Sequence, residues 1–61
     1  MMQTKWEYFA VVIFENGRQK DVTGFVNDCE DRLEASKRVR SLVRDRFDDV
    51  SQVIIEELEM I

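Results

Sequence analysis

The sequence predicts an α+β fold, a two-layer ββαβ sandwich in which one helix packs on one face of a three-stranded antiparallel sheet. Residues 6–14 are almost all aromatic or β-branched, and an Asn-Gly pair follows them at 16–17. Apolar residues then recur at steps of three and four up to Phe47, as they do on one face of a helix. The 61 residues allow one domain, 1–61, because a chain of this length buries only about 60% of its unfolded surface.

Residues 6–14 and 19–26 are predicted to form a β-hairpin. Asn-Gly between two strand-like runs favours a two-residue type I′ turn, which requires positive φ at both central positions. The turn sets which residues face each other, and a slip of one residue would exchange the two faces. On this register the missing side chain of Gly24 leaves room for the ring of Phe9. The pairs on the expected core face are Ile13–Lys20, Val11–Val22, Phe9–Gly24 and Glu7–Val26.

One amphipathic helix is predicted over 28–47, after N-capping residues at Asn27 and Asp28. Residues 52–58 are predicted to form the third strand. A right-handed crossover through the helix would place this strand beside the first, so that the sheet order is 2-1-3. The helix face expected to pack on the sheet comprises Cys29, Leu33, Ser36, Val39, Leu42, Val43 and Phe47.

A single helix covers only one face of such a sheet, and the other face is expected to be apolar. Monomers rarely expose a large apolar patch without using it, and aromatic residues are enriched at the centres of interfaces. The sequence therefore predicts that this face is buried against a second copy or another protein. The predicted interface residues are Trp6, Tyr8, Ala10, Val12, Phe14 and Phe25.

The composition argues against an enzyme. With no histidine and one cysteine, Cys29, the chain lacks the residues for a Ser-His-Asp or Cys-His arrangement and for an internal disulfide. The two glycines match no phosphate-binding loop, and the acid pairs at 48–49 and 56–57 are more simply a solvated turn and strand residues on opposite faces. We therefore expect no cofactor, no metal, no membrane-spanning segment and a cytoplasmic location.

The net charge of −4 makes nucleic acid an unlikely partner and suits a basic protein surface. The predicted function is that of a small acidic protein-interaction module, a homodimer that acts as an inhibitor or adaptor. This prediction includes an analogy of size and charge with small acidic proteins encoded by bacteriophages. The alternative is weak binding of nucleic acid or a phosphate ligand through the basic half of the helix, at Arg38, Arg40, Arg44 and Arg46.

Overall fold

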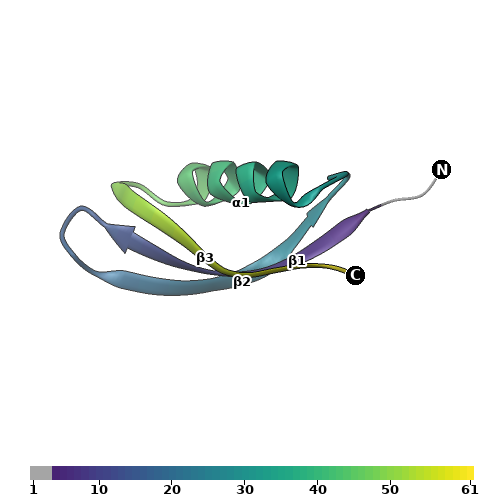
Figure 1. Cartoon of the computed structure of the whole chain (residues 1–61). Coiled ribbons are helices and arrows are strands. Elements are labelled where there is room, and N and C mark those ends of the chain that lie inside the picture. Colours follow the sequence, from purple (N-terminus) through teal and green to yellow (C-terminus); the bar gives the residue numbers. More distant parts are fainter. Residues whose placement is uncertain (1–3) are drawn as a thin grey trace.

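The computed structural model describes residues 4–61, in the order β1 (Lys5–Phe14), β2 (Gln19–Asn27), α1 (Arg32–Arg46) and β3 (Val50–Met60). The strands form one antiparallel sheet in the order β2-β1-β3, and α1 lies across one face of it (Figure 1). The predicted α+β fold and its sheet order are confirmed. β1, the most apolar strand, lies in the centre of the sheet, where it is paired on both sides.

The turn between β1 and β2 holds three residues rather than two. The Gly17 N–H donates to the Phe14 carbonyl over 2.9 Å, and the Phe14 N–H donates to the Arg18 carbonyl over 2.9 Å. In this turn the positive φ is found at Gly17 alone, at +87°. The geometry is that of a type I turn followed by a left-handed residue, and the Asn16 Oδ1 supports it by accepting from the Arg18 N–H. The predicted type I′ turn is wrong, and the hairpin register shifts by one residue.

The shifted register exchanges the two faces of β2 relative to β1. Val22 pairs with Ala10 and Val26 pairs with Trp6, so these four residues share one face. That face lies under α1 and forms the core, because Val22 and Val26 of β2 join the row of β1 that contains Trp6 and Ala10. The buried core residues are Trp6, Tyr8, Ala10, Val12, Val22, Val26, Cys29, Ala35, Val39, Val43, Val53 and Leu58.

Gly24 makes room for Tyr8 and not, as predicted, for Phe9. The two residues are direct partners in the hairpin, and the tyrosine ring lies over the glycine. A Cβ on Gly24 would come within 2.9 Å of the Tyr8 hydroxyl oxygen and 3.1 Å of two ring carbons. Tyr8 therefore packs tightly beneath the helix at the β2 edge.

The helix begins at Arg32, four residues later than predicted. Asp31 caps it, since its Oδ1 accepts from the Glu34 N–H over 2.8 Å. Asp28 has a φ of +61°, which excludes it from the helix and turns the chain after β2. Cys29 is buried in this connection, and its carbonyl accepts a 2.9 Å hydrogen bond from the Trp6 indole. The loop before the helix is thus fastened to β1.

The face of α1 that packs on the sheet is a narrow row of small residues. Ala35, Val39 and Val43 are buried at steps of four. Leu33 was predicted on this face but is 66% exposed, and Leu42 is 42% exposed. Both lie off the row on the helical wheel, because successive residues are rotated by 100°. The small side chains let the helix backbone lie close to the strands.

β3 is an irregular edge strand that is hydrogen-bonded to side chains of the helix. Its register against β1 shifts twice, at Glu56 and at Ser51, each of which is an extra residue without a partner in β1. The Arg40 guanidinium donates to the Val53 carbonyl over 2.8 Å, and that of Arg44 donates to the Val50 carbonyl over 3.2 Å. The helix therefore satisfies backbone groups of this edge as well as covering the sheet.

Gly17→Ala tests the turn without adding a steric clash. A Cβ at Gly17 would meet no atom within 4 Å, so any loss of stability reflects the positive φ. We expect the free energy of unfolding to fall by about 1 kcal/mol in urea denaturation, and Gly17→Asn to cost less because Asn tolerates this conformation. An unchanged free energy of unfolding in Gly17→Ala would contradict the three-residue turn.

A second pair of variants tests which helix face is buried. Val39 is fully buried, so Val39→Ala should lower the free energy of unfolding by about 2–3 kcal/mol. Leu33→Ser should change it by less than about 0.5 kcal/mol, because that side chain is exposed. The same urea titrations measure both, and a larger loss at Leu33 would overturn the assignment.

Candidate functional site

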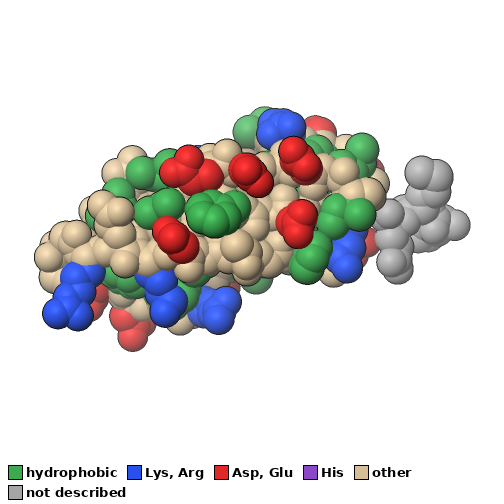
Figure 2. Space-filling view, turned by 90° about the horizontal axis from the view of Figure 1, so that it is seen from below, with side chains coloured by type: hydrophobic (Ala, Val, Ile, Leu, Met, Phe, Trp, Pro, Cys, Tyr) green, Lys and Arg blue, Asp and Glu red, His purple; other side chains and the backbone are tan. Residues whose placement is uncertain are grey.

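The candidate site is the face of the sheet opposite α1, which we call the open face. Within residues 4–61, no other element packs on it, as the side view makes clear (Figure 1). Its centre is apolar, and Figure 2 shows hydrophobic side chains there with acidic groups around them. The apolar residues of the open face, which the strand register places on the same side, are Phe9, Val11, Ile13, Phe25 and Ile54.

The apolar residues of the open face are only partly shielded. Phe25 is 49% exposed and Ile54 38% exposed, whereas Phe9, Val11 and Ile13 on the central strand are half-buried by their neighbours. The Lys5 ammonium lies 4.4 Å from the centre of the Phe25 ring. Phe25 thus already accepts a cation on its ring face, an interaction favoured by the negative potential of that face.

Carboxylates surround the apolar centre. Glu7 pairs directly with Glu59, and Phe9 pairs with Glu57, so Phe9 has one acid near it on β1 and two on the adjacent strand β3. All three line a depression of about 180 Å³ together with Phe9 and Thr23. Like charges placed directly opposite each other are unfavourable in a sheet. The acidic groups of the open face are Glu7, Asp21, Glu57 and Glu59, against one cation, Lys5.

The structure moves most of the predicted interface residues away from the open face. Phe25 is the one that lies there. The others share the helix-facing row, since the three-residue turn aligns this row of β1 with Val22 and Val26. Their predicted placement on the uncovered face is wrong: Trp6, Tyr8, Ala10 and Val12 are buried under α1, and Phe14 is half-buried with its ring edge-on to Phe47 at 5.8 Å.

Three apolar residues of the open face, Phe9, Val11 and Ile13, were predicted on the core face. A fourth, Ile54, was assigned to neither face. The signal that finds them is the turn, because Asn-Gly also suits a three-residue loop in which only the glycine has positive φ. Counting the faces on that register leaves the row of Phe9, Val11 and Ile13 with Asp21, Thr23 and Phe25. This row is visibly more polar than its opposite.

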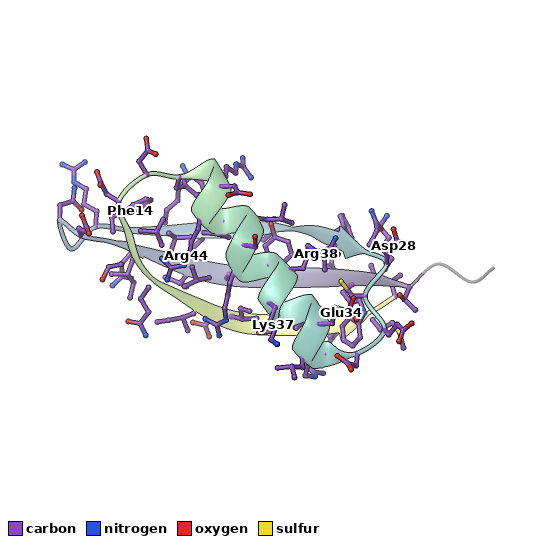
Figure 3. All side chains as sticks on the ribbon, turned by 90° about the horizontal axis from the view of Figure 1, so that it is seen from above. Phe14, Asp28, Glu34, Lys37, Arg38 and Arg44 are labelled. Atoms are coloured by element: carbon purple, nitrogen blue, oxygen red, sulfur yellow. The ribbon has the colours of Figure 1, made fainter. Side chains whose placement is uncertain are left out.

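The basic half of α1 is divided between two sides of the helix. Arg40 and Arg44 donate to carbonyls of β3, so part of their hydrogen-bonding capacity is used within the protein. Arg38 lies on the other side of the helix from Arg44 (Figure 3). The Arg46 guanidinium lies 5.4 Å from the centre of the Phe47 ring. The four predicted anion-binding arginines therefore do not converge on one point.

A shallow apolar groove runs between the C-terminal half of α1 and the sheet. It has a volume of about 370 Å³ and lies next to β2. Half-exposed Leu42 forms part of one wall, and the ring of Tyr8 forms part of the floor. The residues that line it are Tyr8, Val22, Leu42, Val43, Asp45, Arg46 and Phe47.

Among residues 4–61, no group of three or more histidine, cysteine or acidic side chains is arranged to hold a metal ion. Over the same range, none of the chain forms a helix with the length and apolar character needed to cross a membrane. Comparisons with protein-family models, with curated proteins and with solved structures gave no match.

Glu59→Lys tests whether the acidic cluster strains the isolated protein. The change replaces a like-charge pair with Glu7 by an opposite-charge pair, so we expect the free energy of unfolding to rise by about 0.5–1 kcal/mol at low salt. Glu59→Gln, which removes the repulsion without adding an attraction, should give a smaller gain. Urea denaturation measures both, and the gains should shrink in about 1 M salt, where exposed charges are screened. A loss of stability in Glu59→Lys would contradict the expected repulsion.

Proposed function

We propose that this chain is a non-enzymatic protein-interaction module, an inhibitor or adaptor that docks through its open face onto another protein. The observation that carries the proposal is an uncovered sheet face with five apolar residues at its centre and four carboxylates around them. Two of the five are phenylalanines, a residue type enriched at interface centres. A polar rim around an apolar centre is the usual anatomy of a protein interface.

The charges of the open face indicate the chemistry of the partner. Four carboxylates against Lys5 favour a surface that carries lysine or arginine beside apolar groups. Phe25 supports the same inference, since it already holds an ammonium group 4.4 Å from its ring centre. Face-to-face packing of two copies would instead bring two sets of carboxylates together. The open face is therefore better suited to a basic partner protein than to itself.

The repulsion between carboxylates of the open face fits this function. Glu7 and Glu59 face each other across the strands and disfavour the isolated fold slightly. A cationic partner would relieve that repulsion on binding and gain the charge-assisted contacts. We place this activity in the cytoplasm, because the one cysteine, Cys29, is a buried free thiol and a reducing compartment suits it.

The alternative function, weak binding of nucleic acid or a phosphate ligand by Arg38, Arg40, Arg44 and Arg46, has less support. Two of these guanidinium groups are engaged with β3, and Arg38 lies on another side of the helix. A labelled DNA duplex retained at low salt and released steeply as salt rises would favour this alternative. We expect no retention.

Site-specific photo-crosslinking in cells that naturally produce the protein tests the proposal. A crosslinking phenylalanine analogue in place of Phe9, at the centre of the open face, should give an adduct with another protein. The matched control replaces Leu33, which is 66% exposed on the helix. We expect the Phe9 adduct alone, attached near lysine or arginine residues of the partner, and we expect the double variant Glu57→Lys, Glu59→Lys to abolish it.

Adducts at Leu33 and none at Phe9 would sink the proposal. An adduct at Phe9 that survives the charge reversal would show that the acidic groups of the open face do not determine partner specificity. With the crosslinked partner purified, Phe9→Ala should weaken binding by about tenfold or more, as expected for an aromatic residue at an interface centre.

A further inference from the structure

We propose that β2 is a pairing edge and that two copies of this chain join through it, antiparallel, into one six-stranded sheet. The twofold axis would pass between the Thr23 residues of the two copies, at the middle of each strand. This proposal concerns an edge of the sheet and does not rest on the function proposed for the open face. It gives the predicted homodimer a surface where like charges do not meet.

The backbone of β2 presents a regular set of groups to such a partner. The Phe14 N–H donates to the Arg18 carbonyl, and the Asp28 N–H donates to the Thr4 carbonyl. The pairs that exchange hydrogen bonds between β1 and β2 therefore join even-numbered residues. Because these pairs alternate in an antiparallel ladder, the odd residues of β2 point their N–H and C=O groups away from β1. The register is unbroken along β2. The outward residues are Gln19, Asp21, Thr23, Phe25 and Asn27.

The other edge of the sheet is obstructed. β3 carries two bulges, at Ser51 and Glu56, which interrupt a ladder. Its outward carbonyls at Val50 and Val53 already accept hydrogen bonds from arginines of α1. Bulges and covered backbone groups are devices by which proteins prevent pairing at an edge. β3 has both devices, and the contrast with β2 assigns the pairing edge.

The side chains of β2 are compatible with self-pairing centred on Thr23. In that register Thr23 faces its own copy, a favourable cross-strand pair. Asp21 faces the partner copy's Phe25, whose ring holds the Lys5 ammonium at 4.4 Å. The carboxylate of one copy would thus approach the ammonium of the other, twice by symmetry. On the helix side Val22 would face the partner copy's Gly24, over which that copy's Tyr8 ring lies, so an aliphatic group would meet an aromatic one.

The apolar groove beside β2 gains cover in the same arrangement. The groove of about 370 Å³ lies between β2 and the second half of α1, with Leu42 42% exposed at its wall. A twofold axis normal to the sheet would place the two grooves on the same side, flanking the new strand pair. Each copy would then narrow the groove of the other. The dimer would bury apolar surface in addition to the backbone hydrogen bonds.

Sedimentation equilibrium of the full chain tests the pairing edge. We expect a dimer, and we expect Thr23→Pro to weaken it by roughly 10- to 100-fold, since two symmetric hydrogen bonds at the axis are lost. The N–H of Thr23 faces away from β1, so proline removes no hydrogen bond within the protomer. The matched control is Met60→Pro, an outward-facing and exposed position on β3, which should leave the dimer unchanged. A monomeric native chain, or equal weakening by both variants, would overturn the proposal.

Cysteine crosslinking keeps the proposal testable if Thr23→Pro fails to fold. Facing residues at the axis would have Cα atoms about 5.5 Å apart, within the range of a disulfide. Thr23→Cys should therefore oxidise rapidly to a covalent dimer, whereas Asp21→Cys alone should not. A mixture of Asp21→Cys and Phe25→Cys should form the mixed dimer. Failure of Thr23→Cys to crosslink would overturn the register, while the photo-crosslinking at Phe9 would still decide the open-face function separately.

Discussion

The positive φ of Gly17 closes a three-residue turn at the tip of the hairpin, and the rest of the structure depends on the register that follows. This register joins Val22 and Val26 to the row of β1 that contains Trp6, Tyr8, Ala10 and Val12. All the bulky apolar groups of that row then have to be covered. The single helix meets this demand, and it leaves the opposite row to solvent or to a partner.

The helix covers the sheet closely because its inner row is small. Ala35, Val39 and Val43 carry little side-chain bulk, so the large groups of the core come from the sheet. Trp6 extends the core beyond the helix end by donating its indole N–H to Cys29 in the preceding loop. Burying one such aliphatic or aromatic side chain is worth about 1.5–3 kcal/mol, a large share of the stability of a domain this small.

The same arrangement separates charge across the molecule. The helix presents its arginines and Lys37 on one side of the protein, and the opposite face carries Glu7, Asp21, Glu57 and Glu59 around an apolar centre (Figures 2 and 3). A net charge of −4 conceals this division. The open face and the β2 edge are adjoining surfaces, so the dimer that we propose would align two open faces in one sheet. Such a platform would present two equivalent docking surfaces to basic partners, with the gain in avidity that linked sites provide.

The amino-acid sequence by itself determined the element order, the central position of the first strand and the sheet order, because these follow from local periodicity and the handedness of the crossover. It also placed Phe25 on the uncovered face. Asn16-Gly17 suits two turn types that differ by one residue, and the choice between them decided the faces of Trp6, Tyr8, Ala10 and Val12. Only the tertiary structure made that choice, because the local sequence allows both turns and they differ in which row of the strands lies under the helix. The exposure of Leu33 has a similar cause. Apolar residues at steps of three and four define a broad helix face, and only the contact with the sheet shows which row of that face is buried.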